Sequence, residues 1–172
     1  MAAGRGTLSL SRRSVGLVEE RAGPVDNRDV GYVIDDARER IDLDVVWDAL
    51  RAAYWGKSRS RDDVEEQVRQ AWRVIGAYDE ETGAQVGFAR AVSDGVGFAY
   101  LADVIVVDGH RGHGLGKRIV AAMIDDGPGA DFRWTLFTRD AHGLYEQFGF
   151  AAPDDTALVR RAAALPQHPT QL

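Results

Sequence analysis

The spacing of apolar residues along the chain follows two periods, and each period predicts one kind of element. Apolar positions three and four residues apart predict amphipathic helices, whereas alternating or continuous β-branched runs predict strands. The predicted helices begin at Asp42 and at Ser60 and cover residues 117–126 and 140–148. The predicted strands cover residues 31–34, 72–79, 85–92, 98–107 and 133–138, with a short last strand near 157–161.

Side chains at the first two helix starts are typical of helix N-termini. Asp42 is a candidate N-cap residue, and Ser60 with Asp63 forms a capping-box pattern in which aspartate replaces the usual glutamate. The element order β-αα-βββ-α-β-α-β predicts an α/β fold (α+β, with a mixed sheet). In such a fold, helices flank a central twisted sheet that has both parallel and antiparallel strands. We expect antiparallel middle strands and a parallel βαβ half, with a ligand loop at the carboxyl ends of the strands.

Composition limits the class of protein. The 172 residues are 45% hydrophobic and 28% charged, as is typical of a soluble globular chain, and we expect one domain over residues 30–165. Residues 1–29 are expected to be a flexible extension and residues 166–172 a frayed tail. The absence of cysteine excludes disulfides, thiolate metal sites and a cysteine nucleophile.

Charge and hydropathy bear on the partners of the protein. The net charge of −6 argues against general nucleic-acid binding, and no apolar run is long enough to cross a membrane. The N-terminal residues do not have the apolar core of a secretory signal, so the expected compartment is the cytoplasm. The sequence leaves a homodimer open.

A loop rich in glycine lies between a β-branched run and an apolar helix pattern. Gly112, Gly114 and Gly116 have no Cβ atom, so a phosphate group can approach the backbone closely. Backbone N–H groups at the start of a helix attract an anion, and Arg111 and Lys117 add positive charge. The arrangement predicts a cradle for a pyrophosphate, and a glycine-rich turn without a ligand is the alternative.

Other sites that a loop of this composition could form fit less well. The nucleoside-triphosphate loop needs G-x-x-x-x-G-K-[ST], but Arg111 stands where its first glycine would be, and Arg118 replaces the magnesium-binding hydroxyl. The dinucleotide pattern G-x-G-x-x-G fails because the glycine spacing differs. His110 and His113 have no carboxylate partner at metal-ligand spacing, so no metal site is predicted.

Two sequence patterns resemble one enzyme family. Residues Arg111–Gly116 fit R-x-x-G-x-G, and residues Ala141–Phe150 fit A-x-x-L-Y-x-x-x-G-F. In this order and at this separation, they resemble the acetyl-coenzyme A loop and the following helix of the GCN5-related N-acetyltransferases, the GNAT family. The resemblance extends roughly from Tyr32 to Arg160. It implies a GNAT-like sheet in which two strands separate to bind acetyl-coenzyme A.

The resemblance implies roles for residues around the separating strands, 98–107 and 133–138. Pantetheine would bind along the main chain of Val104 and Val106, and the Val104 N–H would polarise the thioester carbonyl. Tyr145 would protonate the departing thiolate, and a core tyrosine bonded to the backbone is the alternative. The implied cofactor-binding residues are Val104, Val106, Arg111, Gly112, His113, Gly114, Leu115, Gly116, Lys117, Thr138, His142 and Tyr145.

The sequence leaves some details of the chemistry open. Thr138 stands where many family members have asparagine, so one hydroxyl would replace an amide group at a pantetheine contact. Asp103 could hold the acceptor amine or take its proton, or it could be a structural carboxylate. Asp94, Tyr100 and a water chain are further candidates for the general base.

The acceptor site is predicted on aromatic and charged residues around the first predicted helix and the strand 98–107. Aromatic rings beside Asp103 would suit a cationic amine, whereas Arg59 would suit an acceptor carboxylate. The predicted substrate-binding residues are Tyr54, Trp55, Arg59 and Tyr100.

The expected reaction is transfer of the acetyl group of acetyl-coenzyme A to a primary amine of a small molecule. Direct attack in a ternary complex is expected, because the chain has no cysteine that could carry the acyl group. The predicted catalytic residues are Tyr145, Val104 and Asp103. The alternatives are a protein or peptide N-acetyltransferase and a non-catalytic regulator that binds coenzyme A.

Overall fold

The computed structural model describes residues 31–53, 56 and 58–160 of the chain. The predicted extension at 1–29, the predicted tail at 166–172 and the acceptor candidates Tyr54 and Trp55 lie outside the described residues.

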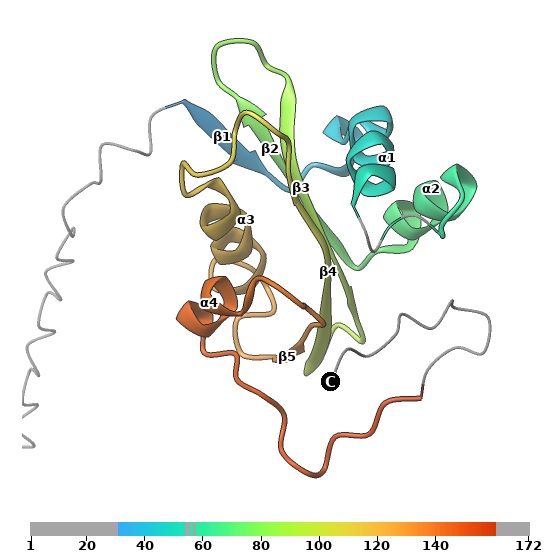
Figure 1. Cartoon of the computed structure of the whole chain (residues 1–172), viewed down its shortest axis with the longest axis vertical. Helices are drawn as coiled ribbons and strands as arrows, with labels where there is room; N and C mark the ends of the chain where they lie inside the picture. Colours follow the sequence, from blue (N-terminus) through green and yellow to red (C-terminus); the bar gives the residue numbers. More distant parts are fainter. Residues whose placement is uncertain (1–30, 54–55, 57, 161–172) are drawn as a thin grey trace, which may run out of the picture.

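Five strands form one open sheet in the order β1-β2-β3-β4-β5 (Figure 1). The first four pair antiparallel with their neighbours, and β5 pairs parallel with β4. This confirms the predicted mixed sheet. The strands are β1 Tyr32–Asp35, β2 Arg73–Asp79, β3 Gln85–Ser93, β4 Phe98–Val106 and β5 Arg133–Thr135.

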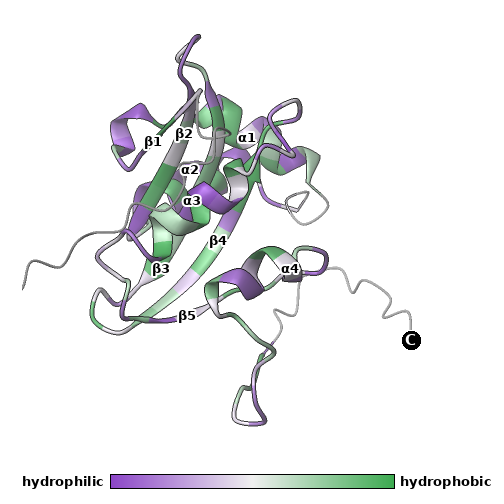
Figure 2. Cartoon of the chain, turned by 90° about the vertical axis from the view of Figure 1, so that its left-hand side faces the viewer, coloured by the Kyte–Doolittle hydropathy of each residue, from purple (hydrophilic) through white to green (hydrophobic). Residues whose placement is uncertain are grey.

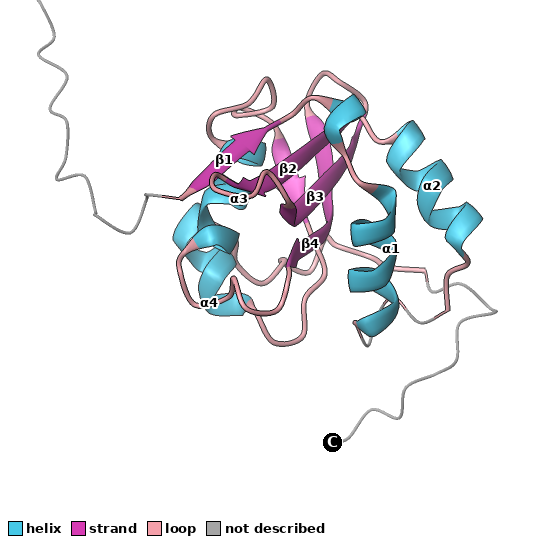
Figure 3. Cartoon of the chain, turned by 90° about the horizontal axis from the view of Figure 1, so that it is seen from above, coloured by secondary structure: helices cyan, strands magenta, loops and turns pink. Residues whose placement is uncertain are grey.

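Helices cover both faces of the sheet, and each covered face has its own core. Helices α1 (Leu43–Ala52) and α2 (Arg61–Gln70) lie on one side of the strands, and α3 (Leu115–Ile124) and α4 (His142–Tyr145) lie on the other (Figure 3). Hydrophobic residues, green in Figure 2, occur along the strands of the sheet and on α3. The core under α3 includes Ile75, Leu101, Ile119 and Met123, and the core under α1 and α2 includes Val46, Leu50, Val64 and Phe88.

Both predicted helix caps are present. The Asp42 carboxylate accepts hydrogen bonds from the backbone N–H groups of Asp44 and Val45, at 2.9 and 3.2 Å. Ser60 Oγ accepts from the Asp63 N–H at 3.1 Å, and the Asp63 carboxylate accepts from the Ser60 N–H at 3.0 Å. Each bond satisfies an N–H group that the first helical turn leaves without a partner. Within the described residues, no helix has both the length and the apolar composition needed to cross a bilayer.

The second half of the chain departs from the predicted element boundaries. The helix predicted over 117–126 begins earlier, at Leu115, because Gly114 adopts a left-handed conformation and serves as the N-cap. The strand predicted over 133–138 ends at Thr135. The helix predicted over 140–148 is a short α4 followed by a 3-10 turn, η2 (Glu146–Phe148), and a second 3-10 turn, η1, covers Arg38–Arg40.

The predicted last strand near 157–161 is wrong over residues 157–160. These residues are not paired with any strand of the described chain, and Leu158 and Val159 are 95% and 65% exposed. A short apolar run forms a strand only where an edge is available to supply its hydrogen bonds and a surface to bury its side chains. The segment that follows α4 runs away from the sheet instead (Figure 1).

Candidate active site

Strand β4 separates from β5 after the first three of its nine residues. The two strands pair at three positions, Phe98 with Arg133, Ala99 with Trp134 and Tyr100 with Thr135. Beyond Tyr100, β4 continues to Val106 with β3 alone as its partner in the described chain. The chain after β5 diverges from β4 (Figure 1). Backbone groups on one edge of β4 are therefore left without a strand partner, as the family resemblance implied.

The other edge of β4 contains a β-bulge at the same level. The register with β3 shifts between the pairs Phe88–Ile105 and Arg90–Ala102, so that two residues of β4, Asp103 and Val104, lie opposite one residue of β3. Asp103 has a φ of 54°, in the left-handed region that aspartate tolerates better than most residues. The bulge bends the strand where it leaves β5.

The side chains of Asp103 and Val104 lie on opposite faces of the sheet, as successive residues of a strand do. Val104 packs against the core under α3. Asp103 bonds instead to side chains from the α2 side of the sheet. The sequence-based expectation that these two residues face opposite ways agrees with this arrangement.

The glycine loop, residues 108–116, connects β4 to α3 and includes the first two residues of that helix, Leu115 and Gly116. Gly109, Gly112 and Gly114 have φ angles of 90°, 82° and 77°, and a Cβ atom built on any of them would meet nothing within 4 Å. No side chain caps the N-terminus of α3. Its first N–H groups therefore adjoin open backbone, which is the setting in which a helix start binds an anion.

The loop lies beside both β4 and α4. A Cβ atom on Gly116 would lie 3.8 Å from Val106 Cγ2 and 3.9 Å from Leu144 Cδ2. Leu115 is almost fully buried in the core under α3, so any contact with a ligand would come from its backbone. The other predicted side chains of the loop and helix start are exposed: Arg111, His113 and Lys117.

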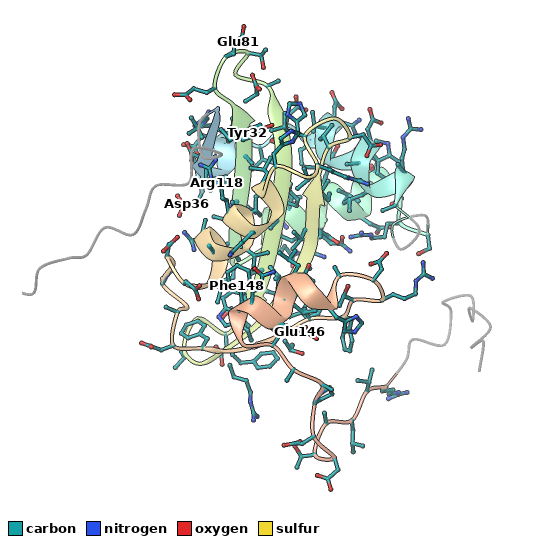
Figure 4. The ribbon with its side chains drawn as sticks, turned by 60° about the vertical axis from the view of Figure 1, so that its left-hand side comes forward. Tyr32, Asp36, Glu81, Arg118, Glu146 and Phe148 are labelled. Carbon is teal, nitrogen blue, oxygen red and sulfur yellow. The ribbon has the colours of Figure 1, made fainter. Side chains whose placement is uncertain are left out.

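Side-chain contacts fix the shape of the glycine loop. Arg111 Nε donates to the Val106 carbonyl at 3.0 Å, which ties the loop back to the end of β4. His110 Nδ1 and Tyr32 Oη are 3.0 Å apart, which links the loop to β1. Arg118 donates to the Tyr32 carbonyl at 2.9 Å, and the two residues lie close together in Figure 4. The Tyr32 contacts were not predicted, because they join segments far apart in the sequence.

Tyr145 and Tyr100 lie near each other on the two sides of the strand separation. Burial is the largest influence on the pKa of Tyr145 and raises it, with smaller contributions from Asp140 and from the Tyr100 phenol. Burial also raises the pKa of Tyr100, and Asp103 adds to that effect. Both phenols therefore keep their protons at neutral pH, and neither hydroxyl has a hydrogen-bond partner among the described residues.

Aromatic neighbours define the surroundings of these two tyrosines. The Tyr100 ring is 5.8 Å from that of Phe137, a residue that the sequence reasoning did not select. The Tyr145 ring is 6.0 Å from that of Phe150, in an edge-to-face arrangement. Both rings thus contact segments that follow the divergence of β5, and Phe137 is 68% exposed beside Tyr100.

Thr138 and His142 lie at the start of α4. Thr138 Oγ1 accepts a hydrogen bond from the Ala141 N–H at 3.2 Å, so the hydroxyl serves the turn that begins the helix. The pattern of threonine three residues before the motif alanine was a signal for this local role. His142 is the first residue of α4, and its side chain is exposed.

Asp103 and Arg59 are brought together, with two residues that the sequence reasoning missed. We define the Asp103 cluster as Arg59, Gln67, Arg90 and Asp103. Arg59 donates to the Asp103 carboxylate through Nη1 and Nη2, at 2.9 and 3.1 Å, and Arg90 Nε donates to it at 2.6 Å. Gln67 Oε1 accepts from Arg59 at 2.8 Å. An arginine within the otherwise apolar run of β3 was the one sequence signal for this cluster.

Asp94, a further candidate for the base, lies in the hairpin turn between β3 and β4. Its Oδ1 accepts hydrogen bonds from the N–H groups of Val96, Gly97 and Phe98, at 2.9, 3.0 and 3.1 Å. These bonds lower the pKa of the Asp94 carboxyl, because they favour its charged form. The residue thus stabilises the turn.

Two cavities of the described chain lie away from these residues, near the C-terminal end of α3. One has a volume of about 430 Å³ and includes Trp72 and Arg73 in its lining. The other has a volume of about 320 Å³ and is lined by Arg73, Ala122 and Asp126, among others. Neither includes a predicted site residue.

Comparison with known proteins identifies the family. Residues 43–150 match the model of the Acetyltransferase (GNAT) family. The chain belongs to the GNAT family. The match covers the strand separation, the glycine loop and α4, and it confirms the family and the fold that the two sequence patterns implied. Members of this acyltransferase family use acetyl-coenzyme A.

Individual GNAT relatives agree with this assignment. The chain is 30% identical to a protein of Xanthomonas campestris pv. campestris assigned to the GNAT acetyltransferases, with a TM-score of 0.70 over 76% of this chain and 93% of that one. It shares the fold of an assigned acetyltransferase from Deinococcus radiodurans, at 20% identity and a TM-score of 0.59 over 77% and 89% of the two chains.

A curated relative from Gibberella zeae, also assigned as an acetyltransferase, is 36% identical over 75 residues, or 43% of this chain. The match spans 40% of that relative's length.

Proposed function

We propose that this protein is an acetyl-coenzyme A-dependent N-acetyltransferase that acts on a primary amine of a small molecule. The observation that carries the proposal is that the free edge of β4, the glycine loop and α4 lie next to one another. Strand β4 leaves β5 after Tyr100, and the unpaired part of β4 leads directly into the glycine loop, with α4 and Tyr145 alongside. We assign the edge of β4 to pantetheine, the glycine loop to an anion and Tyr145 to proton donation, and the order of these elements along the chain supports that assignment.

The residues of these elements fit acetyl-coenzyme A. Open backbone at Gly112 and Gly114 and the uncapped N-terminus of α3 suit a pyrophosphate. The N–H and C=O groups on the edge of β4 that β5 leaves, around Val104 and at the Val106 N–H, suit the amides of pantetheine, which can take the place of a strand. The Val106 carbonyl itself accepts from Arg111. Bound acetyl-coenzyme A would supply an activated acyl group, so the chain itself needs only to position the amine and manage charge and protons.

The proposed catalytic groups each have a defined task. The Val104 N–H would donate to the thioester carbonyl and stabilise the negative charge that develops there. Tyr145 would donate its proton to the departing thiolate, a task favoured by the raised pKa of the phenol, which keeps the proton in place until it is needed. Lys117 and Arg111 are exposed beside the cradle and would add positive charge near the phosphates.

The acceptor is proposed to bind on the α2 side of β4, next to Tyr100. Tyr100 and the exposed ring of Phe137 provide an aromatic surface there, and the phenol hydroxyl is available to bond an amine. Arg59 lies in the segment before α2, four residues after the acceptor candidate Trp55 and five after Tyr54. Because the Tyr100 phenol keeps its proton, it would hold the amine by a hydrogen bond, and a water chain would take the amine proton.

A turnover screen tests this proposal. The purified chain would be incubated with acetyl-coenzyme A and, separately, with polyamines, aminoglycosides, amino acids and short peptides, and released thiol would be measured. We expect thiol release that depends on one class of small amine. Thiol release with peptides alone would favour the protein acetyltransferase, and tight binding of coenzyme A with no release for any amine would favour a non-catalytic regulator.

A further inference from the structure

The Asp103 cluster is a buried ionic arrangement next to the proposed catalytic N–H. The side chains of Asp103, Arg90 and Arg59 are 7%, 10% and 16% exposed. Removing one partner from such a group leaves an uncompensated buried charge, which costs far more than the loss of a surface ion pair. The three charged side chains are therefore held together by the cost of separating them.

The cluster joins three segments of the fold at one carboxylate. Arg59 comes from the segment before α2, Arg90 from β3 and Asp103 from the bulge of β4. The Arg59 contact is bidentate, which fixes orientation as well as distance. Gln67 of α2 accepts from Arg59 and so extends the connection to that helix. The carboxylate of Asp103 cannot move without moving these partners.

The backbone of Asp103 determines where the next peptide group points. With its φ of 54°, the residue is held in a sparsely populated conformation, and such a conformation persists when surrounding contacts determine it. The peptide group that follows Asp103 carries the Val104 N–H. We propose that Arg59, Arg90 and Asp103 are positioning residues that hold the bulge of β4 and thereby orient the Val104 N–H toward the thioester. This inference rests on the proposed function.

The same contacts argue against a direct role of Asp103 in proton transfer. An ionised carboxylate has about four acceptor positions, and three N–H donors of the two arginines already occupy it. An acceptor amine would have only the one remaining position, on a side chain that is 7% exposed. Positioning does not require the acceptor to reach this carboxylate.

The test uses three variants: Asp103→Asn, Arg59→Gln and the double variant that combines these two changes. Each is compared with a control variant, Arg61→Gln. Arg61 is a matched control, because it also contacts two acidic partners, Asp44 at 2.6 Å and Glu65 at 2.7 Å, but on the surface. Amide hydrogen exchange at Ile105, which pairs with Phe88 of β3 directly beyond the bulge, is measured on the protein alone. Turnover, the Michaelis constant for acetyl-coenzyme A and the pH profile of turnover are measured with the acceptor found in the screen.

We expect both single variants to lose turnover by about 10²-fold, as a small misplacement of a reacting group can cause. Exchange at Ile105 should become at least about tenfold faster in both variants, because the β3–β4 pairing beside the bulge opens more often. The Michaelis constant for acetyl-coenzyme A should stay the same, since the glycine loop is untouched. The double variant should be no worse than either single variant, because all three break one unit. Arg61→Gln should change none of these quantities.

Two results would overturn the inference. One is a loss of turnover in Asp103→Asn, together with the acidic limb of the pH profile, while Arg59→Gln keeps both; Asp103 would then transfer the proton. The other is unchanged exchange at Ile105 in both variants. If Asp103→Asn does not fold, Arg59→Gln and Arg59→Lys provide the test, and Lys should restore part of the protection at Ile105. A wild-type protein without acetyl transfer would refute the proposed function, but the exchange data would still decide whether the cluster holds the bulge.

Discussion

The two ends of α3 differ in whether side chains of the protein bond their terminal backbone groups. At the C-terminal end, the Arg73 guanidinium donates to the carbonyls of Ala122 and Met123, at 2.7 and 3.2 Å, and bonds Asp36 at 3.0 Å. At the N-terminal end, the N-cap is Gly114, and no side chain bonds the first N–H groups. A helix leaves unsatisfied groups at both ends. In α3, Arg73 satisfies carbonyls at the C-terminal end, which we call the closed end. The backbone N–H groups at the N-terminal end, which we call the open end, have no side-chain cap.

Glycines at the two ends of α3 serve opposite purposes. A Cβ atom on Gly127 would lie 1.8 Å from Arg73 Nη1, so this glycine makes room for a protein side chain. A Cβ atom on Gly112 or Gly114 would meet nothing within 4 Å. The comparison separates a glycine required by internal packing from one that keeps a surface open. Loss of the first should affect stability, and loss of the second should affect ligand binding.

The largest expected effect concerns Tyr145, the proposed proton donor to the thiolate of a cofactor whose pyrophosphate is held at the N-terminal end of α3. Tyr145→Phe keeps the ring and removes only the proton donor, so turnover should fall by roughly 10²-fold, within the usual contribution of a general acid. Binding of acetyl-coenzyme A, measured by calorimetry, should be unchanged. Tyr78→Phe is the control, because the buried Tyr78 hydroxyl has no hydrogen-bond partner in the described chain. Equal turnover in wild type and Tyr145→Phe, with chemistry rate-limiting, would remove Tyr145 from the mechanism.

At the closed end of α3, Gly127→Ala should displace Arg73 from the helix carbonyls. Hydrogen bonds of a charged group contribute about 1.5–3 kcal/mol each when measured by mutation, so the free energy of unfolding should fall by about 2 kcal/mol. Urea denaturation measures this loss, and Gly97→Ala is the control, because a Cβ atom there would meet nothing within 4 Å. Affinity for acetyl-coenzyme A should not change. Weaker binding in folded Gly127→Ala would show that the two ends of α3 are not independent.

At the open end, Gly114→Ala should weaken binding of acetyl-coenzyme A by at least roughly tenfold, or about 1.4 kcal/mol. The added methyl group would stand where the phosphate approaches, and the left-handed backbone would be strained. Gly95→Ala matches the strain, since the two glycines have φ angles of 75° and 77°, but it lies in the hairpin between β3 and β4. Both variants should lose similar stability, and only Gly114→Ala should lose affinity in calorimetry. Equal affinities would remove the pyrophosphate from this loop.

The local features of the fold could be predicted because few neighbouring residues determine them. The caps at Asp42 and Ser60 depend on residues within three positions, and both are confirmed. The family followed from two short patterns whose order and spacing are informative, and the family match confirms it. The C-terminal cap of α3 could not be predicted, because Arg73 lies 49 residues before Ala122.

Features set by register and distant contacts escaped prediction. The bulge at Asp103 depends on how β3 and β4 align, which packing on both faces of the sheet decides. The partners of Asp103 come from 44 and 13 residues away, so its ionic contacts cannot be read from its neighbours. The end of β5 at Thr135 was missed for a similar reason. The apolar run continues to Phe137, but pairing with β4 stops at the strand separation.

The smallest expected effect concerns the attachment of the open end to β1. Tyr32→Phe removes the hydroxyl that bonds His110 Nδ1 at 3.0 Å but keeps the ring that packs edge-on against the imidazole at 5.7 Å. A hydrogen bond of this kind contributes about 0.5–1.5 kcal/mol, so stability in urea should fall by about 1 kcal/mol. Affinity for acetyl-coenzyme A should fall by less than tenfold, because the glycines and the helix N-terminus remain in place while the loop loses one anchor. In contrast, Tyr78→Phe should leave stability unchanged or raise it, since a buried hydroxyl without a partner is removed. If Tyr32→Phe lowered affinity as much as Gly114→Ala, the orientation of the loop, rather than its open backbone, would control cofactor binding.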